Sequence, residues 1–72
     1  PPPEAEDDTL LRTVMNLPGK YRVVVVLYYY EELKTSEIAS LLHIPLSRVT
    51  VRLSRARRML REKLKGWYYD DE

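Results

Sequence analysis

Residues 35–58 read TSEIASLLHIPLSRVTVRLSRARR, and this stretch decides the fold. A short amphipathic segment is followed by the break His43-Ile44-Pro45 and then by a longer segment that carries Arg48, Arg52, Arg55, Arg57 and Arg58. Proline restricts the residue before it to extended conformations, so the chain turns at the break. Two helices joined by a tight turn, the second of them cationic, are typical of a helix-turn-helix whose second helix enters a DNA major groove.

The first helix of this motif is predicted over residues 35–42, with Ile38, Ala39 and Leu42 facing inward. His43 follows it at the position where a left-handed residue usually ends a helix. Glycine is preferred there, and histidine adopts that conformation at some cost.

The second helix is predicted to begin after Ser47 as its N-cap and to run to about Lys65, where Gly66 ends it. Within it, apolar residues recur at spacings of three and four and define a core stripe of Val49, Leu53, Ala56, Leu60 and Leu64. The arginines fall on the other faces, so we expect them to point outward.

Two further helices are expected upstream. The first begins at Asp7 or Asp8 as its cap and runs to about Asn16, before the break Leu17-Pro18-Gly19. Residues 20–33, KYRVVVVLYYYEEL, have high β propensity and would read locally as a strand. No second strand exists to pair with it, so we predict a buried central helix that starts near Pro18. The expected fold is therefore an all-α, four-helix domain with a C-terminal helix-turn-helix and without winged elements.

The net charge of +1 hides a strong segregation along the chain. Residues 34–66 hold nine lysines and arginines but only two acidic residues, whereas residues 1–33 hold three lysines and arginines and six acidic residues. Such asymmetry is expected of a nucleic-acid binder, the alternative being a merely solvated basic helix.

Several classes of protein are excluded by composition. Seventy-two residues allow one small domain, and cysteine is absent, so disulfides and thiolate metal sites are not expected. One histidine cannot build a metal site, and paired acids, a nucleophile with a base, or a glycine-rich phosphate loop are missing. We therefore expect no metal, no cofactor and no enzymatic activity. No apolar run is long enough to span a membrane, and no signal peptide is evident, so the cytoplasm is the expected location.

The ends of the chain differ in composition from its centre. Residues 1–6, PPPEAE, are predicted to be the remnant of a linker, and the absence of an initial methionine suggests a fragment of a longer protein. Residues 7–66 form the expected domain. Residues 67–72, WYYDDE, form an aromatic and acidic tail that could pack on the core, dock on a partner, or compete with DNA for the arginines.

In this order, the segments strongly resemble region 4 of bacterial RNA polymerase sigma factors, and most of all the extracytoplasmic-function group. The residues that carry the resemblance lie within about residues 9–65 and are Leu17-Pro18, Tyr21-Arg22, Tyr29-Tyr30-Glu31, Glu37-Ile38-Ala39, Ile44-Pro45, Val49, Arg52-Leu53 and Arg55-Ala56-Arg57. A helix-turn-helix alone is a weak signal, but the upstream Leu-Pro and Tyr-Arg pairs at the right distance are not generic.

The resemblance implies a bacterial promoter-recognition domain that binds the −35 element of double-stranded DNA through its second motif helix. It also implies docking on the flap of the polymerase β subunit and, in many relatives, masking by an anti-sigma factor. Carried over by position, base readout falls to Arg48, Thr50, Val51, Arg52, Ser54 and Arg55. Phosphate contacts are assigned to Lys34, Thr35, Ser36, Ser47, Arg57 and Arg58.

This chain departs from the family pattern at several positions. Ser47-Arg48 stands where Gly-Thr is usual. Thr50-Val51 stands where a lysine or arginine followed by serine is usual. These differences change the expected target sequence. Val51 can offer only an apolar contact, such as one to a thymine methyl group. Lys34 replaces a frequent serine cap, so Thr35 is expected to take that role, and Glu32 replaces a common glycine.

Other interpretations of the same residues remain open. Tyr28, Tyr29 and Tyr30 could stack on single-stranded nucleic acid, but we expect them to be buried core aromatics. Arg52 and Arg55 are expected to reach bases, and the alternative is that they contact only phosphates. The rival functions are a sigma-like regulator that never joins polymerase, and a protein-interaction module that uses the tyrosines and the aromatic tail.

Overall fold

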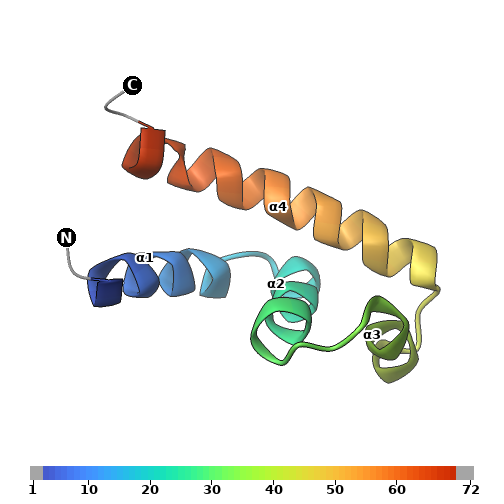
Figure 1. Ribbon diagram of the computed structural model, residues 1–72. Helices are drawn as coiled ribbons and strands as arrows, with labels where there is room; N and C mark the ends of the chain where they lie inside the picture. The colour runs from blue at the N-terminus through green and yellow to red at the C-terminus, as the bar shows by residue number, and fades with distance from the viewer. Residues whose placement is uncertain (1–2, 70–72) are drawn as a thin grey trace.

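The computed structural model describes residues 3–69, which form four α-helices, one π-helical segment and no strand. Helix α4 runs along one side of the molecule, and the shorter helices lie against it (Figure 1). The prediction of an all-α, four-helix domain with a C-terminal helix-turn-helix is confirmed. The elements in chain order are α1 (Pro3–Met15), α2 (Gly19–Val25), η1 (Val26–Tyr30), α3 (Thr35–Leu42) and α4 (Leu46–Tyr69).

Helix α1 begins earlier than predicted. It starts at Pro3, so Asp7 and Asp8 lie inside it and neither is its cap. Proline is favoured in a first helical turn because its fixed φ suits the helix and its missing N–H has no intrahelical partner there anyway. Residues 3–6, expected to belong to a linker, are therefore helical, and the predicted domain boundaries stay predictions.

The short connection after α1 is held by the Tyr-Arg pair of the sequence pattern. Arg22 Nη1 donates a hydrogen bond to the carbonyl oxygen of Met15 at 2.9 Å, at the last turn of α1. The carbonyl of Pro18 accepts hydrogen bonds from the backbone N–H groups of Tyr21 and Arg22, both at 2.9 Å. Pro18 is therefore the N-cap of α2, as its fixed φ allows.

The valine- and tyrosine-rich segment is helical, as predicted against its local β propensity. It is not one regular helix, because α2 gives way after Val25 to the π-helical turn η1, which ends at Tyr30 rather than at Leu33. The backbone N–H of Glu31 bonds to the carbonyl of Val26 at 3.0 Å, the i to i−5 pattern of a π-helix.

The three tyrosines are less buried than predicted. Tyr28 is half-buried, but Tyr29 and Tyr30 are 49% and 46% exposed, so the prediction of buried core aromatics is wrong for these two. A tyrosine keeps its hydroxyl at the surface when a polar partner is available there. The hydroxyl of Tyr29 has such a partner in Arg57 of α4.

Helix α3 has the predicted bounds but a different N-cap. Lys34, with φ −71° and ψ 154°, is the N-cap, and Thr35 lies in the first turn, so the predicted role of Thr35 is wrong. A lysine ammonium group cannot accept a hydrogen bond. Instead, Glu37 Oε1 accepts the backbone N–H of Lys34 at 2.7 Å, which is the carboxylate half of a capping box.

The turn of the helix-turn-helix begins as predicted. His43 ends α3 in the left-handed conformation, with φ 60° and ψ 44°. The carbonyl of Ala39 accepts hydrogen bonds from the backbone N–H groups of His43 and, at 3.1 Å, of Ile44. These bonds pair a carbonyl group in the last turn of α3 that has no other backbone partner within the helix.

Helix α4 starts two residues earlier than predicted. It begins at Leu46, and the carbonyl of Pro45 accepts the first hydrogen bonds from Arg48 and Val49 at 3.0 and 3.3 Å. The first helical hydrogen bonds are accepted by Pro45, which precedes the helix. Ser47 is therefore a residue of the first helical turn and not the N-cap.

The predicted C-terminal end of α4 is also wrong. The helix continues through Gly66 to Tyr69, so this glycine does not end it. A glycine inside a helix costs only about 1 kcal/mol, which a long cooperative helix tolerates. The predicted acidic end of the tail, residues 70–72, lies outside the described residues.

Two adjoining clusters of buried side chains make up the core. The first cluster joins α1, α2 and the middle of α4, and its buried members are Val14, Leu17, Val25 and Ala56. The second joins α2, α3 and the start of α4 through Val24, Ile38, Val49 and Leu53, and we call it the helix-turn-helix cluster. The predicted stripe on α4 is confirmed, with Leu60 half-buried and its other members buried. No helix within the described residues is long and apolar enough to cross a membrane.

Candidate nucleic-acid interface

The buried stripe of α4 determines which side chains its other faces present. Successive residues of an α-helix are rotated by about 100°, so the residues beside the stripe divide into two flanks. Arg48, Arg52 and Arg55 lie on the flank near the start of α2. By the same rotation, Thr50, Ser54 and Arg57 lie on the other flank, and Arg57 contacts η1 there.

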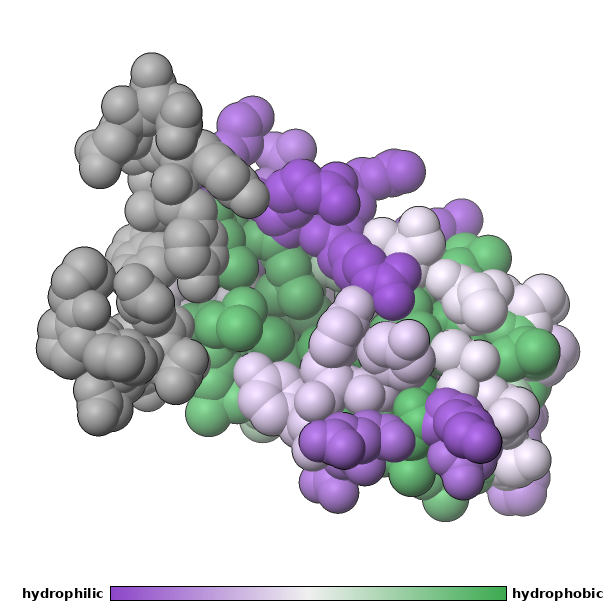
Figure 2. Space-filling view, in the orientation of Figure 1, coloured by the Kyte–Doolittle hydropathy of each residue, from purple (hydrophilic) through white to green (hydrophobic). Residues whose placement is uncertain are grey.

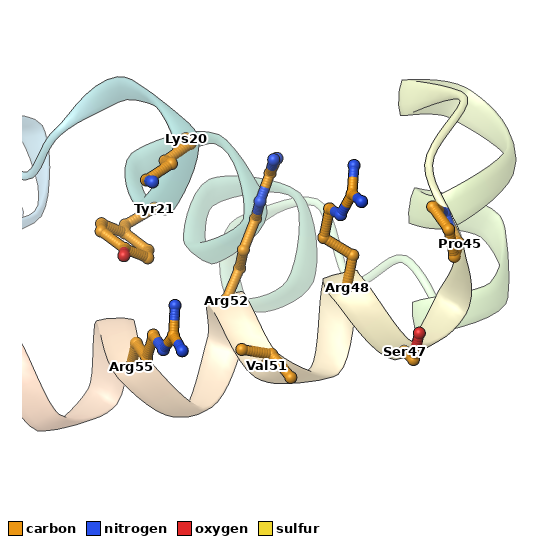
Figure 3. Close-up of a pocket in the computed structure, with 8 residues that line it drawn as sticks. All are labelled: Lys20, Tyr21, Pro45, Ser47, Arg48, Val51, Arg52 and Arg55. Atoms are coloured by element: carbon orange, nitrogen blue, oxygen red, sulfur yellow. The ribbon is translucent and has the colours of Figure 1, made fainter.

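The first flank forms a shallow hollow of about 350 Å³ between α4 and the start of α2. Figure 3 shows Lys20 and Tyr21 of α2 on one side of it and Arg52 and Arg55 of α4 on the other. Four of the six predicted base-reading residues therefore lie together, with one predicted phosphate contact, Ser47. The full lining is Lys20, Tyr21, Pro45, Ser47, Arg48, Val51, Arg52 and Arg55.

Lys20 and Tyr21 are the members of this hollow that sequence reasoning missed. Tyr21 belongs to the family pattern, but nothing in the sequence joins it to the arginines, and Lys20 lies 28 residues before Arg48 in the chain. The Nζ atom of Lys20 lies 5.3 Å from the centre of the Tyr21 ring, a cation–π arrangement. The available signal was the proximity of Lys20 to the Leu-Pro break, which places it at the exposed start of a helix.

The hollow is strongly cationic. Lys20, Arg48, Arg52 and Arg55 bring four positive charges to it, and none of the side chains that the structure describes along it is acidic. Arg48 and Arg55 are exposed, whereas Arg52 is half-buried, which is typical of an arginine that lays its aliphatic stem along apolar surface and keeps its charged end in water. A surface of this kind attracts an anion.

The remaining predicted base readers do not line the hollow. Thr50 and Ser54 are exposed on α4, and the hydroxyl of Thr50 donates a hydrogen bond to the carbonyl of Ser47 at 2.9 Å. That hydroxyl can still accept a hydrogen bond, but its proton is already used inside the helix. The structure thus separates the predicted set into a clustered arginine group and a polar pair.

Arg57 has a partner within the fold. Its Nε donates a hydrogen bond to the hydroxyl of Tyr29 at 2.6 Å, and its guanidinium carbon lies 5.9 and 5.8 Å from the ring centres of Tyr28 and Tyr29. The two rings are themselves in an edge-to-face arrangement, 4.9 Å apart. Arg57 therefore joins α4 to η1, while Arg58 is exposed on the side opposite the core. Their predicted phosphate contacts stay predictions.

Two of the three predicted phosphate contacts at the start of α3 lie on the flank of η1. Lys34 and Thr35 line a second hollow together with Tyr28, so they are on the side of α4 that Arg57 faces. Ser36 is exposed and lines a different surface with Glu37. The structure does not bring the three residues together into one site.

A third hollow is apolar. It has a volume of about 370 Å³, and it lies between α1, η1 and the second half of α4. Figure 2 shows hydrophobic surface between α1 and α4, next to the hydrophilic side chains of α4. Its lining residues are Leu10, Val14, Val25, Tyr29, Tyr30 and Leu60.

The described residues hold no group of three or more His, Cys, Asp or Glu side chains that could bind a metal ion.

Comparison with known proteins agrees with this geometry. The family described as Sigma-70, region 4, matches residues 7–60, which include most of α1, all of α2, η1 and α3, and the first half of α4. The chain is also 41% identical over 58 residues to the ECF RNA polymerase sigma factor SigW of Bacillus subtilis (strain 168). That match covers 81% of this chain and 31% of SigW, so the chain spans about a third of the length of this relative. The resemblance to region 4 is confirmed: the chain belongs to the sigma-70 region 4 family, a DNA-binding helix-turn-helix family of transcription initiation and not a family of enzymes.

Proposed function

We propose that this domain recognises the −35 element of double-stranded promoter DNA through the first half of α4. The observation that carries the proposal is the cluster of Arg48, Arg52 and Arg55 with Val51 on the outward side of the second helix of the motif. An α-helix fits the major groove, where each base pair presents a distinct pattern of donors, acceptors and methyl groups. The domain supplies binding and register, and no chemical step.

Individual roles follow from the side chains. The guanidinium group of arginine can form two hydrogen bonds to guanine O6 and N7, and Arg52 and Arg55 are one turn apart in the middle of the proposed contact surface. Val51 is exposed beside them and offers an apolar contact to a thymine methyl group. Thr50 and Ser54 lie on the adjacent face, where the hydroxyl of Thr50 can accept a hydrogen bond and that of Ser54 can accept or donate one.

Selection of duplexes from a random library tests this function. At low salt, the fragment should enrich one short asymmetric element, and Arg55→Ala should lose the enrichment. Arg61→Ala is the matched control, because Arg61 is an exposed arginine of α4 that does not line the hollow. Binding without enrichment would show that the domain contacts only phosphates, and an absence of DNA binding would contradict the function.

Family membership further supports docking on RNA polymerase, which we place at the apolar hollow between α1, η1 and α4. This partly exposed apolar surface shares no lining residue with the hollow of Arg48, Arg52 and Arg55, so contacts with DNA and with a protein partner are compatible. We expect the flap of the polymerase β subunit as the partner, and an anti-sigma factor as a competitor.

Binding to an isolated flap fragment tests the docking. Tyr30→Ala should weaken it, because Tyr30 is 46% exposed and lines the hollow. Leu41→Ala should not, since Leu41 is a 56% exposed apolar residue of α3 outside the hollow. No binding by the unmodified domain would favour a sigma-like regulator that does not join polymerase.

A further inference from the structure

Glu32, in the turn between η1 and α3, carries a charge that opposes the DNA backbone. We propose that its carboxylate lowers the affinity of the domain for DNA, because it lies beside Lys34 on the surface that one strand approaches. This inference rests on the proposed function, since it assumes that α4 lies in a major groove. It assigns to Glu32 a limit on affinity rather than a contact that favours binding.

The backbone conformation at Glu32 favours glycine. Glu32 has φ 60°, and the backbone N–H of Leu33, which follows it, bonds to the carbonyl of Leu27 at 3.0 Å. This bond closes a left-handed cap at the end of η1, in which glycine is the least strained residue. Other residues persist in this conformation at a cost, and such strain is concentrated at functional sites. The backbone gives no advantage to a glutamate here, so any advantage comes from its side chain.

The side chain of Glu32 is exposed and lines an open hollow of about 540 Å³ at the end of η1. We call it the Lys34 hollow, and its lining residues are Tyr28, Glu32, Leu33, Lys34 and Thr35. Within the described residues, neither Glu32 nor Lys34 forms an ion pair. The nearby carboxylate of Glu37, by contrast, is engaged in the cap of α3. The negative charge of Glu32 is therefore not neutralised by the fold.

The Lys34 hollow lies on the flank of α4 that carries Arg57. Tyr28 lines the hollow, and the centre of its ring lies 5.9 Å from the guanidinium carbon of Arg57. A helix inserted into the major groove has one strand on each side, so this flank faces a single strand. Lys34 attracts the phosphates of that strand as a point charge, and the carboxylate of Glu32 repels them.

Screening by salt keeps this repulsion local. At 0.1 M salt, the interaction between exposed charges is largely screened beyond about 10 Å. Glu32 therefore acts on the phosphates nearest the Lys34 hollow and not on the whole site. Because a phosphate contact carries no sequence information, the repulsion weakens the binding of every duplex and leaves the order of preference among them unchanged. Binding then depends more strongly on the base contacts of α4.

The test replaces Glu32 by glutamine, which keeps the length of the side chain and the strained backbone but removes the charge. Glu31→Gln is the matched control, because Glu31 is the adjacent exposed glutamate, has φ −94° and does not line the Lys34 hollow. Both variants change the net charge by the same amount. The affinity of each variant for the selected duplex is measured against salt concentration.

Glu32→Gln should bind the selected duplex about threefold more tightly than the unmodified protein at 0.1 M salt, and the gain should shrink as the salt concentration rises. Glu31→Gln should give a clearly smaller gain. Glu32→Gly should gain as much affinity as Glu32→Gln, although it also removes the backbone strain, because the charge and not the conformation is responsible. The order of preference among duplexes should be the same in all variants.

A scan of the DNA locates the effect. Single phosphates are replaced, one at a time and on both strands, by neutral methylphosphonates. The positions at which Lys34→Gln no longer weakens binding mark the strand that meets the Lys34 hollow. Replacement at those positions should remove most of the gain of Glu32→Gln, whereas replacement on the other strand should leave that gain intact.

An affinity of Glu32→Gln equal to or below that of the unmodified protein would overturn the inference. Equal gains in Glu31→Gln and Glu32→Gln, or a gain that no methylphosphonate removes, would also overturn it, because the net charge alone would then explain the effect. Unchanged binding by Lys34→Gln would do the same, since the DNA backbone would not meet this hollow. All these results leave the proposed function intact as long as the unmodified protein selects one element, whereas a failure of the unmodified protein to bind DNA contradicts the proposed function itself.

Discussion

Two residues that are not glycine adopt the left-handed conformation, Glu32 and His43, each with φ 60°. For L-residues other than glycine this conformation costs roughly 1–2 kcal/mol. His43 ends α3, where its backbone N–H is hydrogen-bonded. Glu32 lies in the turn between η1 and α3, at the position where the family often has glycine, so its strain is removed by a single substitution.

Glu32→Gly is expected to stabilise the domain by about 1 kcal/mol, since glycine adopts positive φ without the Cβ clash and loses part of the gain through greater freedom in the unfolded chain. In a domain of this size, 1 kcal/mol raises Tm by roughly 4–8 °C, which thermal unfolding followed by circular dichroism measures.

Glu31→Gly is the matched control for this prediction. Glu31 is the adjacent exposed glutamate, but its φ is −94°. The same change of residue there should leave Tm unchanged or lower it. A rise in Tm of equal size in both variants would show that charge removal, and not backbone strain, is responsible.

For the individual arginines, the sequence pattern predicts the direction in which each side chain points but not its contacts. Their outward orientation followed from the apolar stripe Val49, Leu53 and Ala56, and it was correct. That Arg57 is engaged by Tyr29 could not be predicted, because the partner lies 28 residues away and depends on how η1 crosses α4. The same crossing brings Lys20 to Arg52, which no local spacing reveals.

At the scale of the element, α4 differs most from what local sequence preferences predict for a helix end. It contains Gly66 without ending there, although glycine is the residue that most often follows a helix end. A 24-residue helix gains one hydrogen bond for each residue added, and that gain outweighs the preference of one glycine.

Gly66→Ala is therefore expected to raise the helical signal in circular dichroism and to stabilise the domain by roughly 0.5–1 kcal/mol, because alanine is the better residue inside a helix. The measurement is the ellipticity at 222 nm together with the unfolding midpoint in urea. A decrease in either quantity would show that Gly66 ends the helix, as the sequence alone suggests.

Helix type and number were predictable, and helix ends were less so. The bounds of α3 were correct because a capping carboxylate, Glu37, and a break at His43 enclose it. The helical prediction for residues 20–33 rests on the lack of a partner strand and on the flanking Pro18 and Glu31-Glu32, not on the local propensity of the segment. The π-helical turn was missed, since its i to i−5 hydrogen bond has no signature in hydrophobic periodicity. The starts of α1 and α4 were predicted too late. Helix α1 begins at Pro3 and not after an aspartate cap, and α4 begins directly after Pro45 and not after Ser47.

At the scale of the whole molecule, the fold separates two kinds of surface. The first half of α4 and the start of α2 present unpaired cations, whereas α1, η1 and the second half of α4 present an apolar hollow. The helix-turn-helix cluster fixes the first half of α4, and the first cluster fixes its middle. Under the proposed function, the first half of α4 contacts DNA and its second half contributes to the surface for a protein partner.

This arrangement predicts how affinity is distributed. Several cationic contacts give binding that falls steeply with salt, whereas the readout of bases depends on a few groups. If the domain docks on polymerase as proposed, tethering raises its effective concentration at the DNA and supplies much of the affinity in the promoter complex.

The most direct test of base readout by α4 is the discrimination of each base pair by Arg55→Ala. Every position of the selected element is changed in turn, and the affinity of each duplex is measured for the unmodified protein and for the variant at one salt concentration. We expect Arg55→Ala to lose about 1–3 kcal/mol of discrimination at a single base pair and to keep it at the others. A uniform loss of affinity, with every preference intact, would contradict base readout by this arginine and would reduce its role to a phosphate contact.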